Sequence, residues 1–206
     1  MKAKLISGIP EQTTGAYHDT ESQKVYEESS LAAKNFVTLK ERFFSVNSWR
    51  DYCGPGSADF RLFNAKGEYV DRHPKEGDFI RIDIPGPGDF GAKGYDWVEI
   101  EKISNRYLNQ GELENHLIIC RPSKSPQADD ADHHIAHFYS RESSSSFIIS
   151  RGSDFIKVGI YGRNEKANVS KNGFLNKIRS LLISLGGFMK LTKIEWKCVT
   201  DGLLDF

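Results

Sequence analysis

Asp78-Phe79-Ile80-Arg81-Ile82-Asp83-Ile84 is the stretch of sequence that decides the fold. From Ile80 onward its apolar residues alternate with charged ones, which is the period of a strand with one buried face. Strand-like segments surround it without an intervening helical segment, and we predict them at 60–63, 68–70, 95–103, 117–121, 135–140, 146–150 and 155–161. Connections this short cannot make parallel crossovers, so the sequence predicts a strongly curved antiparallel sheet of about seven strands.

Helical periodicity precedes this run of strands. Apolar residues at intervals of three and four place one face of a helix toward the core: Ala32, Phe36, Leu39, Phe43 and Val46. We expect a serine after Glu28 to cap this helix, and Ser45 or Asn47 to cap a short second helix with Trp49 and Tyr52. Residues 1–28 are polar and aperiodic, so we expect a mobile or irregular arm there and one domain over 29–206.

The end of the chain has helical periodicity again. Phe174, Ile178, Leu181 and Leu185 share a helix face that ends at Gly186-Gly187, which predicts a broken C-terminal helix. Residues 191–201 alternate as in a strand, yet Thr192 to Glu195 fits a capping box, and we favour a helix there. The predicted fold class is therefore α+β.

Composition excludes several classes of function. Lys plus Arg (28) equals Asp plus Glu (28), so no net charge favours nucleic acid. The three cysteines contain no C-x-x-C pair, which argues against a disulfide framework and a zinc ribbon. No apolar run approaches the ~18 residues of a membrane span, and no secretory signal is evident. We expect a cytoplasmic protein without a cofactor.

The segment Gly86-Pro87-Gly88-Asp89-Phe90-Gly91 formally matches a dinucleotide-binding motif. That motif needs a helix N-terminus facing the pyrophosphate, whereas a predicted strand follows here. A kinase interpretation of Asp-Phe-Gly also lacks a His-Arg-Asp loop. We expect a long turn, and as a functional alternative a lid loop over a sheet cavity built on Gly86, Gly88, Phe90 and Gly91.

Three histidines stand beside three aspartates between Asp129 and His137. Imidazoles and carboxylates are ligands for divalent transition metals. In a strand, however, only His133 and His137 would share a face, so the segment offers one ion at most two imidazoles. We expect an acidic loop that runs into a strand, with His133 and His137 as weak metal candidates.

No catalytic residue is predicted. Cys53 follows a short helix in a tight turn, and the C-terminal end of a helix disfavours the negative charge of a thiolate. Ser143 to Ser146 lack the G-x-S-x-G elbow of serine hydrolases. Neither nucleophile is supported.

Four residues are candidates for ligand binding: Trp49, Trp97, Tyr161 and Arg163. Alternation places Tyr161 and Arg163 on one face of a strand, where an arginine could hold an acidic ligand group. An ion pair of Arg163 with Glu165 is the structural alternative, and we favour it.

The element order is similar to that of the helix-grip superfamily, which includes START and polyketide-cyclase-like proteins. Phe43-Phe44-Ser45-Val46-Asn47-Ser48-Trp49, an amphipathic helix that leads into a tryptophan before the strands, resembles that superfamily as well. The break at Gly186-Gly187 and the long loop Pro85 to Gly94 depart from its pattern. The resemblance covers most of the chain and implies a pocket for a hydrophobic small molecule or lipid between the C-terminal helix and the sheet.

Three functions compete on this basis. The leading hypothesis is a noncatalytic protein that binds a small apolar or amphipathic ligand. The alternative is a protein–protein interaction module with a filled core and an apolar surface patch. A metal-dependent or other enzyme is third. Oligomeric state and ligand identity are left open.

Overall fold

A computed structural model describes residues 2–54, 57–83, 94–129, 133–168 and 196–206. The described chain is an α+β domain with one seven-stranded antiparallel sheet in the order β1-β7-β6-β5-β4-β3-β2. The strands are β1 (Ala16–Val25), β2 (Asp59–Phe63), β3 (Phe79–Asp83), β4 (Asp96–Ser104), β5 (Glu114–Pro122), β6 (Ser144–Arg151) and β7 (Phe155–Glu165). The helices are α1 (Ser29–Phe44), the 3-10 turn η1 (Val46–Ser48) and α2 (Trp49–Cys53), and residues 196–204 are also helical.

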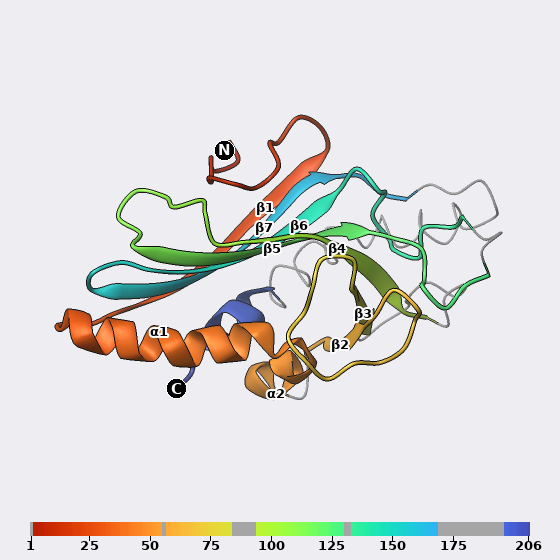
Figure 1. Cartoon of the computed structure of the whole chain (residues 1–206). Helices are drawn as coiled ribbons and strands as arrows, with labels where there is room; N and C mark the ends of the chain where they lie inside the picture. The colour runs from red at the N-terminus through yellow and green to blue at the C-terminus, as the bar shows by residue number, and fades with distance from the viewer. Residues whose placement is uncertain (1, 55–56, 84–93, 130–132, 169–195) are drawn as a thin grey trace.

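The sheet is open, curved and covered by helices on one face. Figure 1 shows α1, α2 and the C-terminal helical residues on that face, here called the inner face, and the N-terminal segment on the other, here called the outer face. Strand alternation directs every second residue of β2 to β7 inward, where the apolar ones form the main core with α1. The core members from α1 and the turn after it are Phe36, Leu39, Phe43, Val46 and Trp49.

A second, smaller core lies on the outer face. Leu117 and Ile119 of β5, Ile148 of β6 and Tyr161 of β7 are buried there. Ile6, Ile9 and Tyr107 pack against them from the N-terminal segment and the loop before β5. The sheet therefore buries side chains on both faces over β5 to β7.

The structure corrects the prediction that residues 1–28 form an irregular arm, because Ala16–Val25 is strand β1. It pairs antiparallel with β7 over its whole length, from Ala16 opposite Glu165 to Val25 opposite Phe155. Polar residues on both faces of β1 hide the alternation that marks a strand. Their partners come from β7, the N-terminal segment and the C-terminal residues, so only the fold explains them.

The strand predicted at 135–140 is wrong. The structure has only an isolated bridge there, between Tyr139 and Ala167. Ala136 instead connects two strands as a loop residue: its N–H donates to the Ser123 carbonyl (2.9 Å), and its carbonyl accepts from Trp97 N–H (2.7 Å). The strand predicted at 68–70 likewise reduces to one bridge, between Phe63 and Tyr69. Apolar alternation alone does not make a strand when no neighbouring strand lies in register.

The predicted helix face is confirmed, and the predicted caps are wrong. Ala32, Phe36, Leu39 and Phe43 are the buried residues of α1. The N-cap position of α1 is Glu28, which has an extended backbone and no side-chain capping bond. Ser45 holds the N-cap position of η1 but makes no capping bond either, and neither does Ser48 before α2. Because packing of one apolar face carries most of a helix's stability, α1 forms without a serine cap.

The predicted broken helix, with its end at Gly186-Gly187, lies outside the described residues. Residues 196–204 are helical, which favours the helix over the strand for the described part of 191–201. Val199, Leu203 and Leu204 of this helix are buried in the main core. Among the described helices, none is both long and apolar enough to cross a membrane.

Asn47 joins η1 to strand β2, at one end of the sheet. Its Oδ1 accepts a hydrogen bond from Leu62 N–H (2.7 Å), and its Nδ2 donates to the carbonyl of Val70 (2.9 Å). Leu62 is fully buried, and its carbonyl accepts from Val70 N–H (3.0 Å). Asn47 was expected as a helix cap, but its side chain instead satisfies the backbone of β2.

We predict that Asn47→Ala lowers the free energy of unfolding by about 1–3 kcal/mol, because it leaves the buried Leu62 N–H without its acceptor. Urea unfolding followed by circular dichroism measures the change. The exposed Asn105 provides the control, since Asn105→Ala should cost less than about 0.5 kcal/mol. Equal costs for the two substitutions would contradict this role of Asn47.

His116 of β5 lies between aromatic rings of α1. Its ring stacks on Phe36 (centroids 6.1 Å apart) and meets Phe44 edge-on (5.4 Å). Desolvation lowers the pKa of His116, and the charge of Lys40 adds to this effect, whereas Glu114, 3.6 Å from its Nε2, opposes it. Because the folded state binds this proton less readily than the unfolded chain, folding favours neutral His116.

We predict that the His116 contribution makes the protein less stable as the pH falls below about 6.5, where the unfolded chain takes up the proton first. His116→Gln should flatten the dependence of unfolding free energy on pH between roughly pH 5 and 7. Urea unfolding over that range tests this. His73→Gln is the control, since the His73 side chain is 61% exposed; an unchanged slope in His116→Gln would refute the prediction.

Candidate functional site

His18 of β1 and Glu165 of β7 form a buried polar pair at one end of the sheet. Nδ1 of His18 lies 2.8 Å from Oε1 of Glu165, and both side chains are less than 10% exposed. The register of β1 on β7 places Gly162 opposite His18. A Cβ atom on Gly162 would overlap with the imidazole and with the Glu165 carboxylate, so the absence of a side chain at this position makes room for the pair.

The Tyr139 hydroxyl also reaches this carboxylate. Burial, together with the charge of Glu165 and a hydrogen bond to it, raises the pKa of Tyr139, which therefore remains a phenol at neutral pH and donates to Glu165. A carboxylate has only acceptors, so His18 donates from Nδ1. Glu165 thereby fixes the orientation of the imidazole through Nδ1, and Nε2 lies on the other side of the ring.

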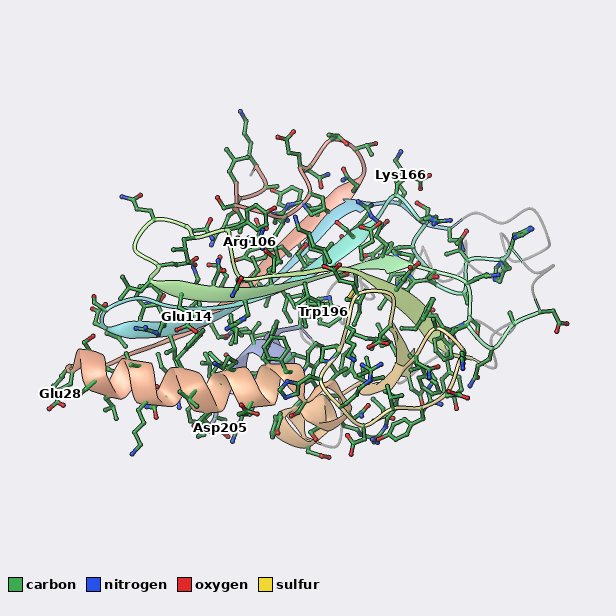
Figure 2. The ribbon with its side chains drawn as sticks, in the orientation of Figure 1. Glu28, Arg106, Glu114, Lys166, Trp196 and Asp205 are labelled. Atoms are coloured by element: carbon green, nitrogen blue, oxygen red, sulfur yellow. The ribbon has the colours of Figure 1, made fainter. Side chains whose placement is uncertain are left out.

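Nε2 of His18 is buried without a hydrogen-bond partner in the part of the chain that the structure describes. A buried polar atom of this kind is uncommon, because each one costs free energy unless something satisfies it. The His18 ring also stacks on Trp196, with centroids 6.2 Å apart and planes within 8°. Figure 2 shows Trp196 on the helix-bearing side of the sheet, so the imidazole belongs to the inner face.

The register extends this site across the sheet. Gly162 of β7 is opposite Ser145 of β6, and Ser145 is opposite Cys120 of β5, so His18, Gly162, Ser145 and Cys120 form one row on the inner face. We call this the polar row. In the next row, Thr20 of β1 is followed by three apolar residues, Ile160 of β7, Phe147 of β6 and Ile118 of β5. The inner face thus changes from apolar to polar over one step along the strands.

Trp49, a predicted ligand contact, is a core residue. It is 0% exposed, and its Nε1 donates to the Phe43 carbonyl (3.1 Å). Its ring contacts Phe60 and Phe147, with centroids 5.3 and 5.2 Å away. The side chain fills the inner face near α2 and leaves no polar atom for a ligand.

The other three candidates lie on the outer face. Trp97 packs on Phe63 in a small cluster of its own. Tyr161 donates its hydroxyl to Oε1 of Glu21 (2.6 Å), and burial and this contact raise its pKa. The structure therefore separates Trp49 from Trp97, Tyr161 and Arg163 by the thickness of the sheet.

Arg163 makes an ion pair as favoured, but with another partner. Its Nη2 lies 2.7 Å from Oδ1 of Asp19, and Glu165 binds His18 instead. Arg163 also donates to the carbonyls of Lys4 (2.9 Å), Gly162 (2.8 Å) and His18 (3.1 Å). The bulge between Ala16 and His18 changes the register just before Glu165 and accompanies this exchange of partners.

The predicted lid loop and the predicted metal ligands gain no support from the structure. The proposed lid residues Gly86, Gly88, Phe90 and Gly91 lie outside the described residues. His133 is exposed and His137 is buried, in a segment that is not a strand, so they share no strand face. No group of three metal-ligating side chains occurs within the described ranges.

A surface groove of about 420 Å³ lies on the inner side of β1, away from the polar row. Its lining includes Ser22 and Lys24 of β1, Tyr52 and Cys53 of α2, and residues of the C-terminal helix. Ser22 donates to Asp201 (2.6 Å), and Lys24 to the Phe206 carbonyl (2.9 Å). These contacts hold the C-terminal helix on β1, and we assign the groove a structural role.

Comparisons with known proteins identify similar structures only. No protein-family model and no curated protein matches the chain. Among solved structures, major latex-like protein 151 of Panax ginseng is 12% identical with a TM-score of 0.36, over 92% of this chain and 97% of its own. Ara h 8.0201 is 9% identical (TM-score 0.35, 93% and 100% covered), and an uncharacterized Bacillus thuringiensis protein 11% identical (TM-score 0.34, 92% and 100% covered).

These neighbours include helix-grip proteins, the superfamily that the sequence resembles. At identities of 9–12% and TM-scores below 0.5, the likeness carries no argument about function.

We predict that Gly162→Ala separates His18 from Glu165 and lowers the free energy of unfolding by about 1–3 kcal/mol, because the new methyl group takes their space. Nitrogen NMR of the imidazole measures the hydrogen bond at Nδ1. Gly159→Ala is the matched control: it meets Tyr161 on the outer face, so it should also destabilise but leave the His18 signals unchanged. Unchanged His18 signals in Gly162→Ala would contradict the assignment.

Proposed function

We propose that this chain is a noncatalytic binding protein for a small amphipathic molecule, whose polar group hydrogen-bonds to Nε2 of His18. The single observation that carries this proposal is the buried Nε2 that no described residue satisfies. Glu165 holds the ring from the opposite side, so the imidazole is preorganised to receive a partner. A ligand that supplies this hydrogen bond removes a desolvation cost that the free protein carries.

The packing of the inner face limits where the molecule binds. Between α1 and the sheet the inner face is filled, since Phe36, Leu39 and Phe43 are each at most 2% exposed. The polar row begins beyond Trp196, whose ring contacts Phe60 and Phe147 on its other sides. We place the polar group of the ligand at His18 and its apolar part against Trp196.

Neighbouring groups favour binding over catalysis. Burial raises the pKa of the Cys120 thiol in the polar row, so the thiolate needed for nucleophilic attack does not form at neutral pH. Tyr139 also stays protonated. Because neither the Cys120 thiol nor the Tyr139 phenol ionises at neutral pH, these groups suit a hydrogen bond to a ligand better than nucleophilic catalysis.

A protein–protein interaction module is the second candidate. The filled space between α1 and the sheet favours this function. So do apolar side chains that are 43–67% exposed, among them Val25, Leu31, Val37 and Leu113. This function predicts no use for the unsatisfied His18 nitrogen. The two functions are therefore separated by whether a His18 substitution affects small-molecule binding.

We predict that the full chain binds anilinonaphthalene sulfonate, an amphipathic fluorescent probe, and that His18→Phe weakens this binding about tenfold by removing one buried hydrogen bond. Fluorescence titration gives the dissociation constant. His73→Phe is the matched control, since His73 is 61% exposed and lies at α1, and it should bind the probe as the parent chain does.

Folding of each variant is checked by circular dichroism, and His18→Gln, which keeps a polar group, serves if His18→Phe does not fold. Failure of the parent chain to bind the probe, or equal binding by the His18 and His73 variants, would refute the proposed function. Native mass spectrometry of the purified chain provides an independent test, because a retained ligand should be lost in the His18 variant.

A further inference from the structure

The surface groove on the inner side of β1 brings together two cysteines that are far apart in sequence. Cys53, the last residue of α2, and Cys198 of the C-terminal helix both line it. Cys198 is exposed and Cys53 is half-buried, and both are thiols in this structure. Figure 1 shows α2 and the C-terminal helix on the same face of the sheet, so the groove runs past both of them.

The C-terminal helix touches the end of α2 at Gly202. A Cβ atom on Gly202 would overlap with the carbonyl oxygen of Tyr52 and lie 3.2 Å from Cα of Cys53, so the lack of a side chain permits this close approach. Residues four apart lie on one helix face, one turn from each other. Cys198 is therefore on the face of the helix that meets α2, one turn before Gly202.

Contacts on either side show which way the end of α2 faces along the C-terminal helix. The guanidinium carbon of Arg42 lies 4.5 Å from the ring centroid of Tyr52 and 4.8 Å from that of Phe206, so Tyr52 faces the end of this helix. The chain after α2 leads to Phe60, whose ring centroid lies 6.2 Å from that of Trp196, at the start of the helix. The last residue of α2 therefore lies between these contacts, beside the first turns of the helix.

We propose that Cys53 and Cys198 are a redox-sensitive pair, which a hydroperoxide oxidises to a disulfide between α2 and the C-terminal helix. The two residues lie about one helical turn apart, and a disulfide joins Cα atoms about 4.4–6.8 Å apart. The third cysteine, Cys120, is 1% exposed in the main core and takes no part. This pair does not depend on the ligand proposed at His18.

The exposed thiol reacts first, because a peroxide reaches it directly. The Cys198 thiolate attacks one oxygen of hydrogen peroxide, the O–O bond breaks, and the released hydroxide becomes water, which leaves a sulfenic acid on Cys198. The Cys53 sulfur then attacks the Cys198 sulfur and gives up its proton, and the S–O bond breaks to release a second water. The two thiols thereby lose two hydrogen atoms, and the peroxide is reduced to two molecules of water.

The disulfide adds a covalent anchor to a helix that polar contacts hold in the reduced chain. Ser22 donates to Asp201, and Arg42 donates to the carbonyls of Gly202 (3.0 Å) and Asp205 (2.8 Å). A disulfide instead restricts the unfolded chain, and its effect grows with the length of the loop that it closes. Oxidation should therefore stabilise the fold.

Peptide mapping tests the pairing. The full chain is treated with hydrogen peroxide, its remaining thiols are alkylated, and it is digested with trypsin without reduction. We expect mass spectrometry to find residues 51–61 joined to residues 198–206, in a chain that keeps the mass of a monomer. The chain unfolded in urea is the control, because loop closure there favours the two shorter pairings, both with Cys120. The folded chain should favour the Cys53–Cys198 pairing at least about tenfold more than the unfolded chain does.

Substitutions separate the pair from the third cysteine. Cys198→Ser should abolish the joined peptides, as should Cys53→Ser, and the exposed Cys198 serves if Cys53→Ser does not fold. Cys120→Ala is the matched control and should form the disulfide as the parent does. Oxidation should raise Tm of the parent and of Cys120→Ala by roughly 5 °C or more, leave Cys198→Ser unchanged, and be reversed by dithiothreitol.

Three results would overturn the proposal. The first is that peroxide yields a Cys198-linked dimer or a sulfinic acid on Cys198 in place of the disulfide. The second is that Cys120 takes part in the dominant disulfide of the folded chain. The third is that the oxidised parent melts no higher than the reduced one.

Discussion

Burial of the Arg163 charge is the constraint on which the rest of the structure depends. A guanidinium that is 1% exposed costs several kcal/mol unless every donor is met. Its partners are the Asp19 carboxylate and the carbonyls of Lys4, His18 and Gly162, so β7 can be buried only when β1 and the N-terminal segment are in place. The same assembly brings His18 to Glu165 and lays Ile6 and Ile9 on the outer face.

Periodic apolar residues made most of this fold predictable. The helix face of α1 and strands β2 to β7 follow from spacing, since each places periodic apolar residues in the main core. Strand β1 does not, because Asp19 and Glu21 on its outer face are stabilised by Arg163, Tyr161 and Lys4, which the local sequence cannot reveal. Conversely, residues 135–140 alternate like a strand, yet their backbone groups make single bonds to Trp97 of β4, to Ser123 and to residues that follow β7, and form no continuous ladder.

The candidate site was less predictable than the fold. Tyr161 and Arg163 were correctly identified as polar residues on one face, but Arg163 pairs with Asp19 of a segment that was expected to be irregular. His18 was missed for the same reason: its partner Glu165 is 147 residues away, and no local motif joins them. Gly162 was the available signal, since a glycine inside a strand indicates a close approach of another group. Trp49 shows the reverse error, because aromatic residues serve cores more often than sites.

The contacts of Asn47 affect how the molecule behaves among other copies of itself. An open sheet ends in strands whose backbone groups can recruit a strand from another chain, which is a route to aggregation. At Leu62 both backbone groups are already engaged, the N–H by Asn47 and the carbonyl by Val70. The side-chain amide of Asn47 thus occupies a backbone donor at this edge of the sheet that a strand from another chain would otherwise bind.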